Sequence, residues 1–200
     1  MNDSAIKKWN KASNCLDAGS RGEELRYAVY KSHLFSKAKG KTLLVAAGTG
    51  LDFKHFPTGL DIVAIDFSPK MLEKAREKLS DYKGDITLKE ADVTNLDFED
   101  GVFDSVVTSC TFCSVPEPVK GLKEIHRTLK PDGKLLMYEH VRPGSLLLGV
   151  VADIMNPLAR FFGPNINRRT ADNVRKAGFK ITREFNVYLD MVKLFEAEKV

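Results

Sequence analysis

The chain has few cysteines and no long apolar run, and each shortage argues against a class of protein. Three cysteines among 200 residues do not make the paired framework of a disulfide-rich secreted domain. The N-terminal stretch MNDSAIKKWNK lacks the apolar core of a secretory signal peptide. The best apolar run, from Ser145 to Ala152, is far shorter than the roughly 20 residues that span a bilayer. We therefore expect a cytoplasmic location.

The one close cysteine pair, Cys110 and Cys113, has the spacing C-x-x-C but lacks the surroundings of a metal or redox site. A zinc site needs four ligands, and only Cys15 and scattered histidines remain to complete one. A redox pair usually opens a helix, whereas this pair follows the strand-like segment FDSVVTS. We expect ordinary packing for both cysteines and predict no metal.

A strong excess of charge of one sign is also missing. The formal net charge is +4, and hydrophobic and charged residues make up 43% and 29% of the chain, as in ordinary globular proteins. So mild a charge gives no electrostatic footprint for nucleic acid. We expect one domain, residues 1–200, large enough to bury its own core, and no nucleic-acid partner.

Short apolar runs alternate with helical patterns along most of the chain. Helical spacing of apolar residues over 69–79 and 119–129 places helices between strands, and Ser68-Pro69 is a typical helix start. The last two runs are so close in sequence that they predict an antiparallel hairpin. The predicted fold is α/β, a single doubly wound, mostly parallel seven-stranded sheet with that hairpin at its edge. The seven predicted strands are 42–46, 61–65, 86–88, 105–108, 134–139, 179–185 and 191–197.

Three segments outside this alternation have their own predictions. Residues 1–40 are helical in pattern and are predicted to close over the site as a lid, the alternative being simple packing against the edge of the sheet. Residues 141–170 are apolar and irregular, with three prolines and three glycines, and we expect them to cover the substrate. Residues 130–133, Lys-Pro-Asp-Gly, have the composition of a turn.

The stretch VAAGTGLDF, residues 45–53, follows the first predicted strand, where ligands of open α/β sheets bind. A dinucleotide fingerprint starting at Gly48 needs a third glycine at position 53, and Phe53 stands there. A P-loop needs Lys-Ser or Lys-Thr after its last glycine, and Leu51-Asp52 follows instead. The loop is therefore predicted to approach a ligand without binding a phosphate.

The loop resembles the S-adenosylmethionine loop of class I methyltransferases, E/D-x-G-x-G-x-G, although Leu44 stands at the acidic position and Ala46 at the first glycine. The segments VAIDFSPKML, KEADVTNLDF, FDSVVTS and LKPDGKLLMYEH follow in the order of that family. The resemblance implies S-adenosylmethionine as cofactor, with S-adenosylhomocysteine as product. It implies that Asp66 accepts from both ribose hydroxyls, that Asp92 accepts from the adenine amino group, and that Val93 covers the ring. The alternative for Asp66 and Asp92 is that they only cap helices or turns. The expected cofactor-binding residues are Ala46, Ala47, Gly48, Thr49, Gly50, Asp66, Phe67, Met71, Asp92, Val93 and Ser109.

Further tracts are similar to a narrower group of methyltransferases that act on phospholipids, quinones and alkyl thiols. These are WNKASNCLD, GTGLDFKHFP, TFCSVPEP, YEHVRPG and DMVKLFEAEK. The similarity implies a small or lipophilic acceptor: a phospholipid headgroup amine, a thiol or a quinone-like ring. Expected acceptor contacts are Trp9, Glu139, His140 and Arg142, with His140 as a candidate base. The alternative for His140 is a structural hydrogen bond to the backbone or to Glu139.

Two other functions fit parts of the pattern. The departures at Leu44 and Ala46 leave room for a domain that binds S-adenosylmethionine or S-adenosylhomocysteine without catalysis. An NAD-dependent oxidoreductase is opposed by Phe53 and by the C-terminal hairpin. Seven basic residues between 160 and 183 suggest peripheral contact with an anionic membrane, the alternative being a solvated charged face.

Overall fold

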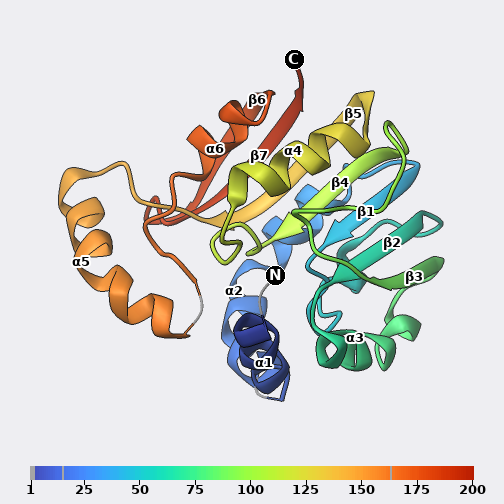
Figure 1. Cartoon of the computed structure of the whole chain (residues 1–200), viewed down its shortest axis with the longest axis horizontal. Helices are drawn as coiled ribbons and strands as arrows, with labels where there is room; N and C mark the ends of the chain where they lie inside the picture. The colour runs from blue at the N-terminus through green and yellow to red at the C-terminus, as the bar shows by residue number, and fades with distance from the viewer. Residues whose placement is uncertain (1–2, 15, 163) are drawn as a thin grey trace.

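The computed structural model of the chain describes residues 3–14, 16–162 and 164–200, and its centre is one twisted sheet (Figure 1). Seven strands lie in the order β3-β2-β1-β4-β5-β7-β6. The first five strands along the chain pair in parallel, and β7 pairs antiparallel with both β5 and β6. The predicted fold class is confirmed. The strands are β1 (Lys41–Val45), β2 (Asp61–Asp66), β3 (Asp85–Glu90), β4 (Phe103–Ser109), β5 (Leu129–His140), β6 (Phe179–Tyr188) and β7 (Val192–Lys199).

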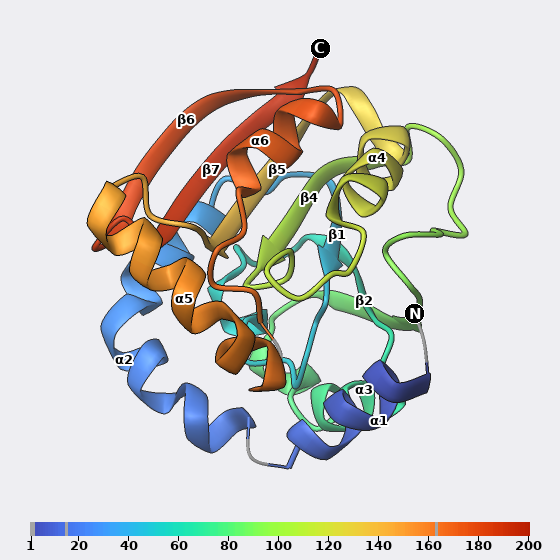
Figure 2. The ribbon, with the colours of Figure 1, turned by 60° about the vertical axis from the view of Figure 1, so that its left-hand side comes forward.

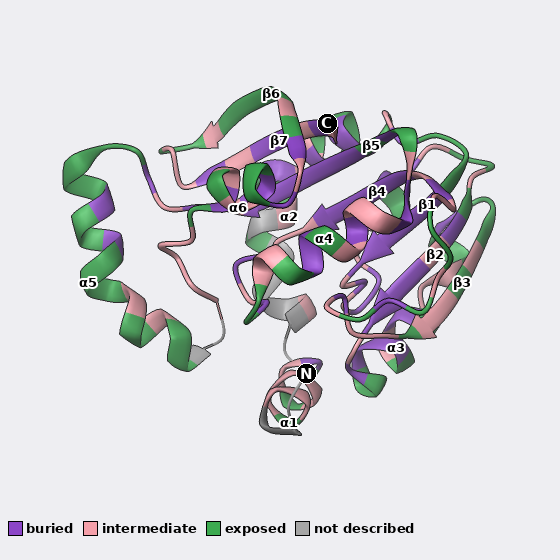
Figure 3. Cartoon of the chain, turned by 45° about the horizontal axis from the view of Figure 1, so that its top comes forward, coloured by how far each residue is buried: buried purple, intermediate pink, exposed green. Residues whose placement is uncertain are grey.

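Helices cover both faces of the sheet, and neighbouring residues of one strand therefore enter different cores. Leu43 packs in the core under α4 and α6, and Leu44 packs in the core under α2. This alternation is the two-residue period of a strand that is buried on both sides. Figure 3 shows the central strands as the most buried part of the chain. The helices are α1 (Asp3–Ala12), α2 (Leu16–Phe35), α3 (Pro69–Arg76), α4 (Pro118–Thr128), α5 (Leu146–Phe162) and α6 (Thr170–Lys176), with short 3-10 turns η1 (Phe53–His55) and η2 (Leu79–Asp81).

The predicted start of α3 has the expected geometry. Ser68 is the N-cap, its hydroxyl accepts from the Met71 amide at 3.2 Å, and Pro69 occupies the first turn. The observed helix α3 is shorter than the predicted range 69–79, because the chain leaves the α-helix after Arg76 and then forms the 3-10 turn η2. The start of α3 is thereby fixed beside the end of β2.

Two segments differ from the sequence-based expectation. Residues 130–133 were predicted as a turn, but they lie inside β5 as an irregularity: Phe103 pairs with Leu129, and Ser105 pairs with Lys134. The segment 141–170 was predicted as irregular, but it contains the 17-residue helix α5, which runs through Pro157. Proline and glycine masked the helical pattern there, because a helix accommodates one proline at the cost of a single hydrogen bond and some strain.

The carboxyl ends of the parallel strands face α1 and α2. Figures 1 and 2 show these two helices at that end of the sheet, with α5 standing further out on the same side. Within the part of the chain that the structure describes, no helix is both long enough and apolar enough to cross a membrane. This end of the sheet is the place to look for a ligand site.

Candidate functional site

A cleft opens at the carboxyl ends of β1, β2 and β4, where the glycine-containing loop leaves β1. It is closed on its outer side by α1 and α2, which contribute Trp9, Glu24 and Lys31. Parallel strands bring their carboxyl ends to one edge, so residues far apart in sequence meet here. The predicted cofactor residues that line this cleft are Ala46, Ala47, Gly48, Thr49, Asp66, Phe67, Met71, Val93 and Ser109.

The loop after β1 turns through left-handed backbone conformations. Ala46, Gly48 and Gly50 have φ values of 57°, 55° and 82°. A Cβ on Gly50 would lie 2.7 Å from the Phe53 ring and 3.0 Å from the Ala75 backbone. Gly50 thus packs closely against Phe53 and Ala75, and it is not among the described residues that line the cleft. Ala46 adopts a conformation that costs an L-residue about 1–2 kcal/mol, which glycine would avoid.

Asp66, at the end of β2, is buried and tied to the loop. Its Oδ2 accepts from the Gly48 amide at 2.9 Å, and its Oδ1 accepts from the Ser68 amide at 2.9 Å. Burial raises the pKa of Asp66 to about 6, against the lowering effect of these hydrogen bonds. A carboxylate offers about four acceptor positions, so Asp66 has capacity left for hydroxyl donors in the cleft.

Asp92 occupies a different position from Asp66. Its Oδ1 accepts from the Thr94 amide at 2.9 Å and from the Thr94 hydroxyl at 2.8 Å, which closes a turn after β3. It is not among the described residues that line the cleft, whereas the adjacent Val93 is. The adenine contact of Asp92 stays a prediction.

Glu139, predicted to contact the acceptor, is fully buried beneath the cleft, and its contact with an acceptor stays a prediction. Its Oε1 accepts from the Thr108 hydroxyl at 2.7 Å and from the Thr111 amide at 3.2 Å, and its Oε2 accepts from the Phe112 amide at 3.0 Å. Burial raises the pKa of Glu139 to about 7, and the hydrogen bonds oppose this rise. The carboxyl group therefore holds the segment after β4 in place, and with it the cleft residue Thr111.

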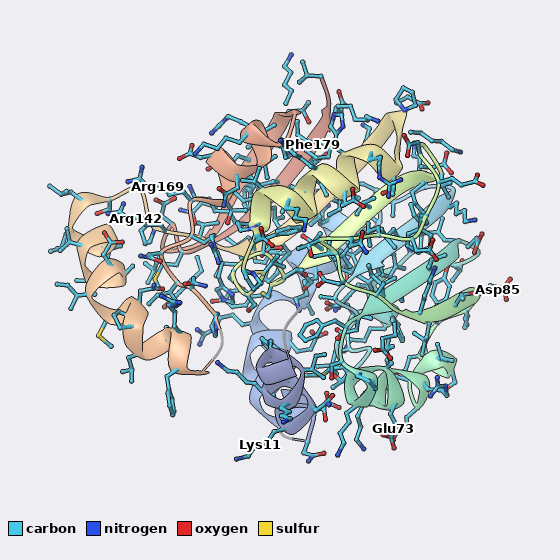
Figure 4. All side chains as sticks on the ribbon, viewed as in Figure 1. Lys11, Glu73, Asp85, Arg142, Arg169 and Phe179 are labelled. Carbon is cyan, nitrogen blue, oxygen red and sulfur yellow. The ribbon has the colours of Figure 1, made fainter. Side chains whose placement is uncertain are left out.

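His140 and Arg142 lie outside the described cleft lining. The His140 side chain is within hydrogen-bonding reach of the Cys113 thiol, whose pKa is raised by burial and lowered by that contact. The Arg142 guanidinium pairs with Asp153 of α5, with Nη2 and Oδ2 2.8 Å apart, and Figure 4 shows Arg142 beside that helix. The roles proposed for His140 and Arg142 toward an acceptor remain predictions.

Cys110 lines the cleft, and Cys113 is buried next to it. Within residues 3–14, 16–162 and 164–200, the single cluster with the spacing of metal ligands is Glu24, Asp52 and His55, which contains no cysteine. Cys15 lies outside the described residues.

Sequence reasoning missed several residues of the cleft. Asp52 lies within the glycine-containing stretch 45–53, directly after Leu51, and its position was a usable signal. Glu24 and Lys31 sit in a helix without a motif, and only the packing of α2 against η1 brings them to the cleft. The other unpredicted lining residues include Leu51, Thr111, Ser114 and Val115.

Comparison with known proteins gives one family. Residues 43–137 match a model of the methyltransferase domain. The chain is 36% identical over 149 residues to a ubiquinone/menaquinone biosynthesis C-methyltransferase of Citrifermentans bemidjiense, a match that covers 72% of the chain and 63% of the relative. It is 33% identical over 124 residues to a phosphatidylethanolamine N-methyltransferase of Cereibacter sphaeroides, covering 61% of the chain and 60% of the relative. The chain therefore spans somewhat less than two thirds of these relatives.

A solved structure of an S-adenosylmethionine-dependent methyltransferase from Aquifex aeolicus has the same fold. It superposes with a TM-score of 0.69 and 21% identity, and the match covers 100% of both chains. The seven-stranded sheet with its antiparallel strand is thus the arrangement seen in that protein.

Proposed function

The chain belongs to the methyltransferase-domain family, and from this premise we propose that it is an S-adenosylmethionine-dependent methyltransferase with a small or lipophilic acceptor. The observation that carries the proposal is the cleft itself: a left-handed loop after β1 lies beside a buried carboxylate at the end of β2. The two relatives described above are named for a quinone and for a phospholipid headgroup, and an acceptor of this kind is proposed here.

The cleft suits a cofactor that carries a ribose and no phosphate. The backbone of residues 46–50 would lie against the amino-acid portion, and Asp66 would accept from the ribose hydroxyls. The apolar side chains of Phe67, Met71 and Val93 would flank the adenine. When bound, S-adenosylmethionine supplies a methyl group already activated on a positively charged sulfur. The protein then has to hold the acceptor in line with that group and exclude water.

The segment 1–40 is proposed to act as the lid of this cleft. Asp17 of α2 pairs with Lys78 at 2.8 Å, and Lys78 also donates to the Thr49 carbonyl at 2.9 Å. The Ser68 hydroxyl donates to the Asn10 amide oxygen at 2.6 Å. These contacts join both N-terminal helices to the loop after β1 and to the start of α3, so lid position and cofactor site are coupled.

Asp66→Ala is expected to weaken S-adenosylhomocysteine binding by about 1.5–3 kcal/mol, which is about 10- to 150-fold. Because the pKa of Asp66 is raised to about 6, the ionised acceptor is present above that pH and lost below it. Wild-type affinity should therefore fall about tenfold between about pH 7 and about pH 5, and the affinity of Asp66→Asn should not. Isothermal titration calorimetry at both pH values checks this.

The control for this experiment is Asp97→Asn, which changes an exposed carboxylate beyond β3 and should bind like the wild type. An unchanged affinity in Asp66→Ala would contradict the ribose assignment. Binding of NAD(H) in place of S-adenosylhomocysteine would favour an oxidoreductase. Cofactor binding without turnover on any acceptor would favour the non-catalytic alternative.

We also propose that the protein meets its acceptor at an anionic membrane surface, with α5 as the contacting helix. Leu146, Leu147, Ile154 and Phe161 on this helix are 81%, 73%, 71% and 77% exposed. Figure 3 shows α5 standing away from the sheet with much of its surface exposed. Apolar helices of this kind lie in the interface of a bilayer. The seven basic residues between 160 and 183 complement an anionic surface, at about 1 kcal/mol each.

The protein is expected to co-sediment with phosphatidylglycerol vesicles at low salt, and the double variant Leu147→Glu/Ile154→Glu is expected to bind them at least about tenfold more weakly. Two charges placed on α5 would have to enter the apolar part of the interface. Val200→Glu is the matched control, because Val200 is 89% exposed but lies at the far end of β7. Absence of pelleting at low salt, or equal pelleting of the double variant, would refute the membrane contact.

A further inference from the structure

A buried imidazole lies directly behind the wall of the cleft. His55, at the end of η1, is 7% exposed and packs edge-on against the Phe35 ring at 5.9 Å between centroids. Its Nε2 is 3.0 Å from Oε1 of Glu24, and its Nδ1 is 2.8 Å from the hydroxyl of Ser32. Both partners belong to α2. The ring therefore connects two side chains that stand two turns apart on one helix.

The two partners face different surroundings. Glu24 lines the cleft together with Asp66 and the loop after β1, whereas Ser32 is exposed on the outside of the molecule. His55 itself does not line the cleft in the part of the chain that the structure describes. Glu24, His55 and Ser32 thus form a row that runs from the cleft to solvent.

The inner link of this row is unusual. Oε1 of Glu24 and Nε2 of His55 are both buried and 3.0 Å apart, but the contact is not aligned as a hydrogen bond, so proton transfer between them requires a rotation of the carboxyl group. Burial lowers the pKa of His55, and Asp52 and Glu24 oppose this effect, while Lys31 and Lys54 add to it. The imidazole is therefore neutral near pH 7, with a nitrogen available to take a proton.

The same residues do not suit a metal ion. Ligand atoms of Glu24, Asp52 and His55 lie within 4.8 Å of one another. However, the ammonium group of Lys54 is 2.8 Å from Oε1 of Glu24, and that of Lys31 is 3.1 Å from Oδ1 of Asp52. Two cations already balance the two carboxylates, so proton transfer is the chemistry left to this cluster.

We propose that Glu24, His55 and Ser32 form a relay that carries the acceptor's proton from the cleft to solvent. The inference rests on the proposed methyltransferase function. An acceptor with an N–H, O–H or S–H bond gives its proton to the Glu24 carboxylate, and the bonding electron pair stays on the nitrogen, oxygen or sulfur. Glu24 passes a proton to Nε2 of His55, and the proton on Nδ1 leaves through the Ser32 hydroxyl to water. Glu24 begins and ends ionised, and one proton leaves for each acceptor used. His55 is left protonated on Nε2 and returns to the Nδ1–H form by proton exchange with water before the next turnover.

A first test needs no acceptor. Histidine titrations by NMR should place the His55 midpoint below the ordinary value, and Glu24→Gln should lower it by about half a pH unit or more, because a facing negative charge is lost. Glu73→Gln, an exposed change on α3 (Figure 4), is the matched control. His33→Gln and His55→Gln assign the resonances. A His55 midpoint that does not respond to Glu24→Gln would overturn the relay.

A second test uses turnover at saturating cofactor with three acceptor probes: phosphatidylethanolamine vesicles, naphthoquinol and hexanethiol. The acidic limb of the wild-type rate should have the NMR midpoint of His55. His55→Gln should lose this limb and about a hundredfold in rate, and Glu24→Gln a similar factor, with S-adenosylhomocysteine affinity retained. His33→Gln, on the exposed side of α2, should match the wild type.

The two arms separate the relay from the function on which it rests. A protein that binds S-adenosylhomocysteine but methylates none of the three probes contradicts the proposed function, and the NMR coupling then decides the relay alone. Loss of the acidic limb in His140→Gln instead of His55→Gln would move the base to His140 and overturn the relay. If His55 has only a structural role, His55→Gln should lower stability and cofactor affinity together and leave the pH profile of the rate unchanged.

Discussion

Glu139→Ala is expected to lower the free energy of unfolding by about 3 kcal/mol or more and to disorder the cleft wall after β4. The substitution leaves three buried donors without an acceptor: the Thr108 hydroxyl and the amides of Thr111 and Phe112. Each such donor costs about 1–3 kcal/mol. Chemical denaturation measures the loss, and Glu117→Ala, an exposed change before α4, is the control.

The pH dependence of stability gives a sharper version of the same test. The pKa of Glu139 is raised to about 7, so the folded state favours the protonated carboxyl group. The stability that this group contributes is greatest below its unfolded pKa and falls as the pH rises toward 7, by at most about 1.4 kcal/mol per pH unit. Asp66, raised to about 6, acts in the same direction over a lower range. Glu139→Gln should remove the pH dependence of the free energy of unfolding nearest pH 7. If that pH dependence is unchanged, it arises from another group.

The sheet could be predicted because most of its strands have a local sequence pattern that is typical of a buried strand. Runs such as residues 42–46, Thr-Leu-Leu-Val-Ala, are apolar at every position after the threonine, as expected for a strand that is covered on both faces. The site lies at the carboxyl ends of the parallel strands, so the order of the strands along the chain also indicated where Asp66 would lie. These features depend on residues that are neighbours in sequence.

The parts that were missed depend on packing between distant segments. Nothing local marks Glu24 as a cleft residue, since its place follows from the packing of α2 against η1. Glu139 was predicted as an acceptor contact because it stands next to His140 at the end of a predicted strand, and nothing in the sequence indicated that the amides of Thr111 and Phe112 would donate to its buried carboxylate. Helix α5 was predicted as an irregular segment because many of its apolar residues are exposed. They therefore do not follow the spacing of a helix with one buried face.

Gly50→Ala is expected to abolish measurable cofactor binding and to destabilise the fold by about 2–5 kcal/mol. At a φ of 82° an added methyl group is strained, and it would also lie 2.7 Å from the ring of Phe53. Phe53 is fully buried and the backbone of Ala75 stands 3.0 Å away on the other contact, so neither can yield without moving η1 or α3. Overpacking of this kind costs about 1–3 kcal/mol beyond the backbone strain.

Gly59 offers a matched control that measures the cost of the backbone strain alone. It has the same φ of 82°, but a Cβ there would meet nothing within 4 Å. Gly59→Ala should therefore cost only about 1–2 kcal/mol and keep S-adenosylhomocysteine affinity at the wild-type value. The difference between the two variants measures how tightly the loop after β1 is wedged between η1 and α3. If both variants lose the same stability and both still bind, the loop is free to shift, and the cleft does not depend on the packing behind Gly50.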